Sequence, residues 1–167
     1  NNIVTSTVGL RVIKNSSHNT FLNNNITSFN GSATQGIIFD DTGSGYDNYL
    51  IYNNSFGQIS WLDTGNITVN GNSTLKLGSN LKITNNSIYF NSSDIPSLNK
   101  SANLTLYNIS GNDRWPFRDG TSCSSDFCTE LIDGSTYVFK VSNLDEYEYS
   151  VQEFTPPCNY DINYPGV

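Results

Sequence analysis

Phe21-Leu22-Asn23-Asn24-Asn25-Ile26 is the first copy of a motif that decides the predicted fold of this chain. Two further copies, starting 30 and then another 32 residues along, are Ile51-Tyr52-Asn53-Asn54-Ser55-Phe56 and Ile83-Thr84-Asn85-Asn86-Ser87-Ile88. Such a period is typical of repeat architectures. Asn tolerates the left-handed backbone of a sharp corner, and stacked coils would align Asn24, Asn53 and Asn85 in one hydrogen-bonded column. The motif therefore predicts a parallel β-helix, a solenoid of short strands and tight corners.

The composition indicates an all-β protein. Of the 167 residues, 14% are charged and none is Met, while ten Tyr and nine Phe add to the β-branched residues that favour strands. The formal net charge of −7 argues against a nucleic-acid partner, because nucleic-acid binding needs clustered Lys and Arg. No stretch approaches 18 apolar residues, so we expect no membrane span. The chain starts at Asn1 with neither Met nor a signal peptide, which suggests processing or a fragment.

Asn-x-Ser/Thr sequons favour an extracellular, N-glycosylated protein. Eleven occur before residue 110, and the predicted acceptors are Asn15, Asn25, Asn30, Asn53, Asn66, Asn72, Asn85, Asn91, Asn99, Asn103 and Asn108. A chain this rich in Asn, Ser and Thr also produces sequons by chance, so an accidental origin stays open. We expect acceptors in loops or on alternating strands to be the more accessible ones, namely Asn15, Asn30, Asn66, Asn72, Asn91 and Asn103. No cofactor is expected besides these covalent glycans.

The three cysteines agree with an oxidising compartment. Cys123, Cys128 and Cys158 allow three single-bridge pairings, and local loop closure favours a disulfide between Cys123 and Cys128. Cys158 would then remain for a partner chain or an alternative pairing. A metal site would need two further ligands near the cysteines. The only histidine, His18, is far away in sequence, so we predict no metal.

Changes in pattern divide the chain into three predicted parts. Residues 1–94 carry the Asn motifs and are interpreted as β-helix coils. Pro96 would interrupt a ladder hydrogen bond and marks the boundary. Residues 95–153 contain alternating strands, such as residues 102–109, which suit an antiparallel sheet with one solvent face and predict a small β-sandwich or cap. Residues 154–167 hold three of the five prolines and are expected to form an extended tail.

The chain resembles archaeal-type cell-surface proteins built from β-helix repeats. Residues 12–21 and the Asn motifs are similar to the right-handed parallel β-helix repeats of periplasmic copper-binding and pectate-lyase-like proteins. The second half of the chain resembles the Cys-containing C-terminal module of such surface proteins. The similar residues are 98–106, Asp119-Gly120, Cys123, Cys128, 137–141 and Tyr149-Ser150-Val151. The resemblance covers most of residues 9–153. It implies an exported surface protein with right-handed coils followed by a small antiparallel immunoglobulin-like β-sandwich. Thr155-Pro156-Pro157-Cys158 has no counterpart in that module.

An enzymatic interpretation depends on carboxylates in the coils. Pectate-lyase-like and polygalacturonase-like β-helices cleave polysaccharides with clustered Asp residues, and the best cluster here is Asp40-Asp41 with Asp47. Neighbouring strand residues point to opposite faces, so Asp40 and Asp41 would form no acid–base pair unless Asp41 begins a corner. We favour a turn that both residues cap, and we interpret His18 as a corner residue. No catalytic residue is predicted.

Calcium and sugar binding are lesser alternatives. Oxygen ligands for calcium could come from Asp126, Asp133, Asp145 and Glu146, although their spacing matches no known loop and a solvated surface is favoured. A platform for stacking sugars could come from Trp61, Trp115, Tyr46, Tyr49 and Tyr52. Both tryptophans are expected instead to pack the domain junction and the cap.

The sequence thus predicts a non-enzymatic extracellular structural protein. A solenoid exposes a backbone edge at an uncapped end, and strand-like sequence begins within three residues of Asn1. Such an edge could pair head to tail with another copy and propagate into a cell-surface filament or sheath, with residues 154–167 supplying a pairing strand. The alternative is a carbohydrate-binding or polysaccharide-cleaving β-helix protein with cell-surface glycans as its partners.

Overall fold

A computed structural model describes the backbone of residues 2–4, 10–13, 20–28, 37–46, 49–62, 67–75, 78–93 and 96–153. Side chains are described for residues 51–62, 78–93, 96 and 98–153. This part of the chain is all-β, as the composition predicts, with one short 3₁₀ helix, η1 (Pro96–Leu98). No helix in it is long and apolar enough to cross a membrane. The strands are β1 (Asn2–Val4), β2 (Leu10–Ile13), β3 (Thr20–Ser28), β4 (Ile37–Tyr46), β5 (Tyr49–Asn53), β6 (Gly57–Trp61), β7 (Ile67–Leu75), β8 (Leu81–Thr84), β9 (Ser87–Phe90), β10 (Ala102–Tyr107), β11 (Arg114–Arg118), β12 (Thr121–Ser122), β13 (Cys128–Ile132), β14 (Thr136–Val141) and β15 (Tyr147–Glu153).

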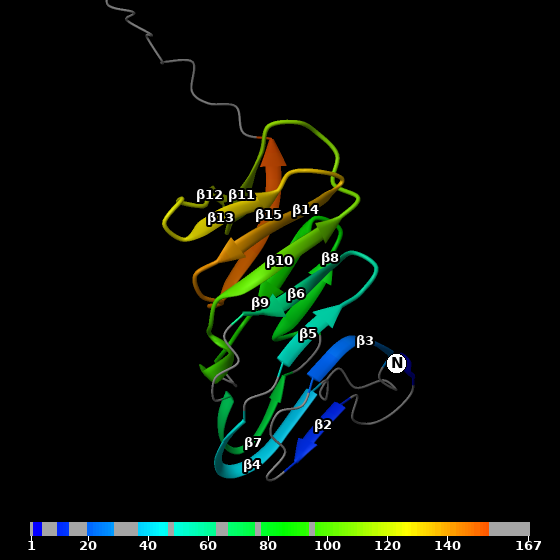
Figure 1. Ribbon diagram of the computed structural model, residues 1–167, viewed down its shortest axis with the longest axis vertical. Coiled ribbons are helices and arrows are strands. Elements are labelled where there is room, and N and C mark those ends of the chain that lie inside the picture. The colour runs from blue at the N-terminus through cyan, green and yellow to red at the C-terminus, as the bar shows by residue number, and fades with distance from the viewer. Residues whose placement is uncertain are drawn as a thin grey trace, which may run out of the picture.

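The strands form three sheets (Figure 1). The seven-stranded sheet has the order β1-β3-β5-β6-β10-β14-β13, and the five-stranded sheet has the order β12-β11-β15-β9-β8. A smaller sheet contains β2, β4 and β7. From β5 to β13 every pair in the seven-stranded sheet is antiparallel, as is every pair in the five-stranded sheet. In the order of the five-stranded sheet, the last described strand, β15, lies in the middle.

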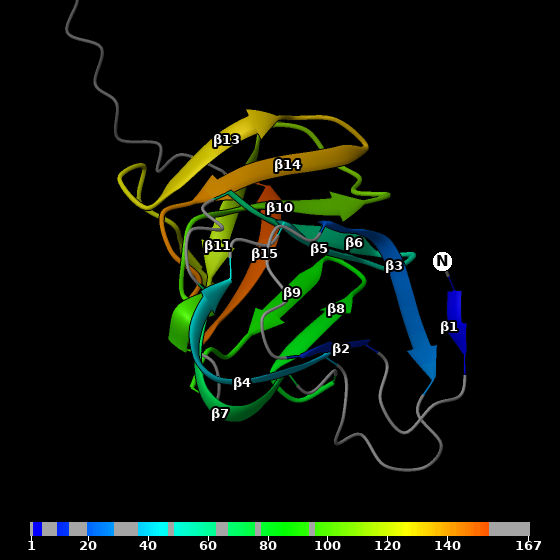
Figure 2. The same cartoon turned by 60° about the horizontal axis from the view of Figure 1, so that its bottom comes forward.

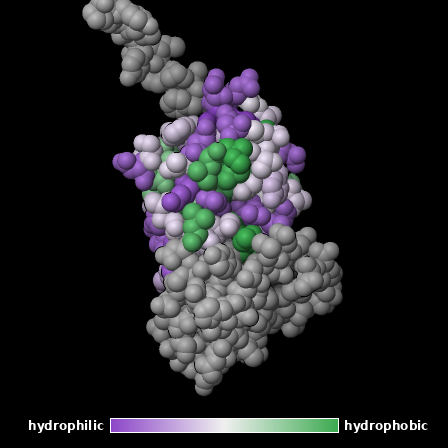
Figure 3. Space-filling view, in the orientation of Figure 1, coloured by the Kyte–Doolittle hydropathy of each residue, from purple (hydrophilic) through white to green (hydrophobic). Residues whose placement is uncertain are grey.

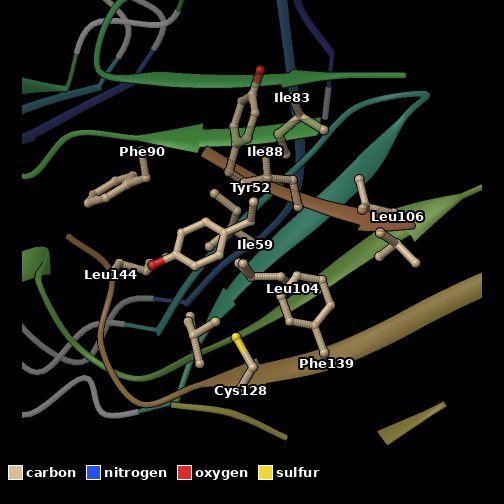
Figure 4. Packing of buried hydrophobic residues seen from close by; sticks show 14 of the residues in the cluster. Tyr52, Ile59, Ile83, Ile88, Phe90, Leu104, Leu106, Cys128, Phe139 and Leu144 are labelled. Carbon is tan, nitrogen blue, oxygen red and sulfur yellow. The ribbon is translucent and has the colours of Figure 1, made fainter. Parts of the chain in front are cut away.

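The two antiparallel sheets pack face to face as the two layers of a β-sandwich (Figure 2). Fully buried side chains from both layers meet in the core (Figure 4), among them Ile59, Leu104 and Phe139 from one sheet and Ile88 and Phe90 from the other. Tyr149 of the second sheet is also fully buried. The rings of Trp61 and Phe90 meet edge to face with centroids 5.7 Å apart. Such aromatic pairs contribute about 0.5–1.5 kcal/mol beyond the burial of their area.

Alternating sequence builds the core face of each strand. In β10 and β14 every second residue is fully buried, namely Ala102, Leu104, Leu106, Tyr137, Phe139 and Val141. The register places Leu104 opposite Phe139, so these side chains share one face of the sheet. The antiparallel pairing of β10 with both β14 and β6 confirms the sheet type predicted for this segment.

The described residues form no parallel β-helix. Parallel pairing joins β1 to β3, β3 to β5 and β2 to β4, but β5–β6 and β4–β7 are antiparallel, so the winding does not continue. The predicted Asn column is wrong, because Asn53 ends β5 in one sheet and Asn85 lies in the β8–β9 turn of another. The second and third motif copies form hairpin turns instead. The same residue types favour tight hairpins and coil corners, so the motif is compatible with both.

Asn54 of the second motif fastens its hairpin to the opposite layer. Its Oδ1 accepts hydrogen bonds from the backbone N–H groups of Phe56 (2.9 Å) and Gly57 (3.2 Å). Its Nδ2 donates to the carbonyl of Ile83 on β8 at 2.9 Å. One side chain therefore both closes the β5–β6 turn and bridges the two sheets.

Asn86 of the third motif extends a strand ladder with its side chain. The residue has a left-handed φ of 53° in the β8–β9 turn. Its Nδ2 donates to the carbonyl of Val151 at 2.7 Å, and its Oδ1 accepts from the N–H of Val151 at 3.1 Å. Because β15 pairs with β9 only as far as Tyr149 opposite Ile88, the amide satisfies the next backbone groups of β15.

Strand pairing crosses the predicted boundary at Pro96. β6 pairs with β10, and β9 pairs with β15. η1 begins at Pro96, and the Nε1 of Trp61 donates to the carbonyl of Leu98 at 3.0 Å. Four segments that the sequence assigned to coils, β5, β6, β8 and β9, are therefore strands of the sandwich.

Candidate glycosylation and disulfide sites

The predicted glycan acceptors divide by how far the structure describes them. Asn15, Asn30 and Asn66 lie outside the described residues. The backbone of Asn25 lies in β3 and that of Asn72 in β7. Side chains are described for the remaining six, Asn53, Asn85, Asn91, Asn99, Asn103 and Asn108.

Asn85 and Asn108 are the exposed acceptors among these six. Asn85 lies in the two-residue turn between β8 and β9, where Thr84 pairs with Ser87. Asn108 follows β10 with a left-handed φ of 57°. Both residues are exposed, as a bulky surface glycan requires.

The other four described acceptors are half-buried. The Nδ2 of Asn91 donates to Glu146 Oε1 at 2.9 Å, which occupies the atom that a glycan would modify. A buried Oδ1 with no hydrogen-bond partner occurs at Asn53, Asn99 and Asn103. Asn91 and Asn103 were expected to be accessible, but they are less exposed than the two turn residues, because turns rather than alternating strands expose these amides.

Cys123 and Cys128 form a disulfide with Cα atoms 5.8 Å apart, the pairing that local loop closure favours. Both cysteines are buried, with 4% and 0% of their surface exposed. The backbone N–H groups of Phe127 (3.0 Å) and Cys128 (2.8 Å) donate to the carbonyl of Ser124 and order the loop between them. Cys158 lies outside the described residues.

The candidate catalytic carboxylates do not occupy a turn. Asp40 and Asp41 lie within β4 and pair with β7. The prediction that both residues cap a turn is therefore wrong. Asp47 and His18 lie outside the described residues.

Three of the four acidic residues considered for calcium make separate contacts. Asp133 forms an ion pair with Arg114. Asp145 Oδ1 accepts a hydrogen bond from the N–H of Glu146 at 2.9 Å. In the part of the chain that the structure describes, no group of three His, Cys, Asp or Glu side chains converges on one point.

The aromatic residues considered for sugar stacking mostly pack inward. Trp61 is 2% exposed and Tyr52 is 7% exposed. Trp115 is half-buried, and its Nε1 donates to the carbonyl of Cys123 at 2.8 Å, beside the disulfide. The side chains of Tyr46 and Tyr49 are outside the described set. Trp61 and Tyr52 therefore offer no open face to a sugar.

A polar network that the sequence did not indicate ties the β10–β11 connection to the β13–β14 hairpin. Arg114, 7% exposed, pairs with Asp133 and donates its Nη1 to the carbonyl of Ile109 at 2.9 Å. The fully buried Tyr137 donates its hydroxyl to Glu130 Oε2 at 2.5 Å. Burial, and then the hydrogen bond to Glu130, raise the pKa of Tyr137, so the phenol stays protonated and keeps donating.

No known protein family, curated protein or solved structure matches this chain. The described residues supply two exposed sequons in turns, one buried disulfide and a two-layer sandwich with an exposed apolar edge.

Proposed function

We propose that the chain is a non-enzymatic extracellular structural protein of the archaeal cell-surface type that carries N-glycans. The observation that carries the proposal is the exposure of Asn85 and Asn108 in turns. A glycan attached at either residue would extend into solvent without displacing a core side chain. The buried Cys123–Cys128 disulfide supports the same location, because disulfides persist in oxidising compartments.

The same proposal includes head-to-tail assembly of copies into a surface filament. β13 is an edge strand of the seven-stranded sheet, and β1 is the other edge strand among the described residues. Leu131 and Ile132 on β13 are 48% and 54% exposed, and Figure 3 shows apolar surface gathered over β13 and β14. A contact between unlike edges of one sheet repeats without closing, which gives a filament.

We also propose right-handed parallel coils in the first part of the chain. Parallel pairing of β1, β3 and β5 in one sheet and of β2 and β4 in another supports solenoid coils in the first part of the chain. The sandwich would be the immunoglobulin-like module that ends those coils.

Glycan mapping tests the modification. In a host that attaches N-glycans, we expect glycans at Asn85 and Asn108 and none at Asn99 or Asn103. Asn85→Gln and Asn108→Gln should each remove the mass of one glycan, measured on the intact protein and on its peptides. Asn112→Gln, which changes an exposed Asn outside any sequon, is the matched control. Unmodified Asn85 and Asn108 in the mature protein would refute the proposal.

Electron microscopy tests the assembly. We expect the mature protein to form filaments and the double variant Leu131→Lys/Ile132→Lys to need at least about tenfold more protein to do so, because one contact of about 1.4 kcal/mol corresponds to a factor of ten. The variant moves the net charge from −7 to −5 (−7 + 2), so added repulsion would not explain the loss. Leu62→Lys, at a residue 44% exposed away from β13, is the control. Isolated monomers at every concentration would end the assembly hypothesis.

A further inference from the structure

A groove of about 250 Å³ opens where β13 and β14 meet the disulfide loop. Its lining is mostly polar and consists of Ser101, Asp126, Phe127, Thr129, Lys140 and Ser142. Thr129 of β13 lies opposite Lys140 of β14, and the N–H of Ser142 donates to the carbonyl of Phe127 at 3.0 Å. The floor of the groove is thus a paired sheet, and one wall is the loop that the disulfide closes.

Phe127 is held in place before any ligand arrives. Its backbone lies inside the Cys123–Cys128 loop. The guanidinium of Arg118 lies over its ring at 4.3 Å from the centroid, and the ring of Tyr147 meets it edge to face at 6.3 Å. An aromatic ring fixed by a cation–π contact loses little conformational entropy when a ligand packs against it.

The polar groups of the groove are available for hydrogen bonding. Asp126 and Lys140 are exposed, and neither side chain makes an ion pair or hydrogen bond with another described residue. The carboxylate of Asp126 accepts hydrogen bonds, the ammonium of Lys140 donates them, and the hydroxyls of the groove do both. The two charges sum to zero, which disfavours a strongly charged ligand.

We propose that this groove binds one pyranose unit of a neutral glycan. The volume is below the roughly 300–1,000 Å³ of pockets that hold drug-sized ligands, so it fits a single small ring. A sugar ring combines an apolar C–H face, which suits Phe127, with hydroxyls that both donate and accept, which suit Asp126 and Lys140. This inference goes beyond the structural role and does not depend on assembly.

The test is a titration of the full-length, glycan-free chain with neutral methyl glycosides, followed by amide chemical shifts. We expect saturable shifts at residues 126–129 and 140–142 with a Kd on the order of 1 mM, the range for a ligand of this size. Asp126→Asn and Lys140→Met should each weaken binding at least about tenfold. Asp113→Asn and Lys82→Met remove the same groups elsewhere on the surface and should leave the Kd unchanged.

Several results would overturn the proposal. They are no saturable shift with any glycoside, shifts confined to another surface, or equal weakening by the control and groove variants. The glycosylated protein identifies the source of the sugar. Shifts of the same amides without added ligand indicate glycans of neighbouring copies, and their absence indicates a glycan from elsewhere. Because the titration observes monomers, it can fail while filaments form, or succeed without them.

Discussion

Gly57→Ala is expected to lower the free energy of unfolding by about 3 kcal/mol, the upper end of the usual cost of overpacking. A Cβ at Gly57 would lie 2.3 Å from the backbone oxygen of Thr105 and 3.2 Å from Ile83 Cγ2. The first neighbour belongs to β10, where Leu106 pairs with Gly57, and cannot move without separating two central strands. Ile83 comes from the opposite layer, so the added methyl group would strain both sheets.

Urea unfolding of the parent and the variant measures this loss. Gly134→Ala is the matched control, because its Cβ would meet nothing closer than the oxygen of Thr136 at 3.6 Å. That substitution should be neutral or stabilise by up to about 1 kcal/mol, since it reduces the entropy of the unfolded chain. Equal stability of the Gly57 variant and the parent would show that β6 and β10 do not approach as closely as described.

Loss of the disulfide is expected to cost about 2 kcal/mol, the loop-closure entropy for a short loop. Cys123 and Cys128 are separated by 5 positions, so the bridge restricts only a small part of the unfolded chain. The double variant Cys123→Ser/Cys128→Ser should therefore unfold at lower urea than the parent. A reductant should shift the parent to the same midpoint.

Two comparisons isolate the bridge. The reductant should have no further effect on the double variant. Cys158→Ser should keep the parent's midpoint and its response to reductant, because it leaves the Cys123–Cys128 pair intact. A parent whose midpoint ignores reductant would contradict the described disulfide.

Strands with clean alternation were predictable from the sequence. Residues 102–109 were expected to form a strand, and β10 covers Ala102–Tyr107 of them. β10 was expected to be antiparallel because every second side chain is apolar, and it is. Local pattern suffices here because burial on one face of a sheet is encoded with a period of two.

Strands that break a local rule were missed. β11 contains Pro116, which lacks an N–H and argues against a strand, yet Pro116 pairs with Val151 at the centre of the sheet pairing between β11 and β15. β13 has four exposed residues in five and a register shift between Glu130 and Ile132, so it carries little periodicity. Only the neighbouring strands identify these segments.

The Asn motif shows why a turn signal does not specify a fold. The second and third copies correctly indicate tight turns, and Asn86 does adopt a left-handed φ. The first copy, at residues 21–26, lies within β3 instead. Whether a turn leads to a parallel coil or an antiparallel hairpin depends on which distant strand receives the next segment, and one motif carries no such information. For the same reason the groove could not be predicted from the sequence. Asp126 and Lys140 are 14 positions apart, and the pairing of β13 with β14 brings them to one groove.

The place of β15 in the middle of its sheet sets the timing of folding. A nascent chain cannot join β11 to β9 until Glu153 has been synthesised, because β15 lies between them. Until then β9 lacks its neighbouring strand on one side, and non-local pairing of this kind is slow. The sandwich therefore cannot close until β15 has been synthesised, and a chain truncated before β15 would stay open and prone to aggregation.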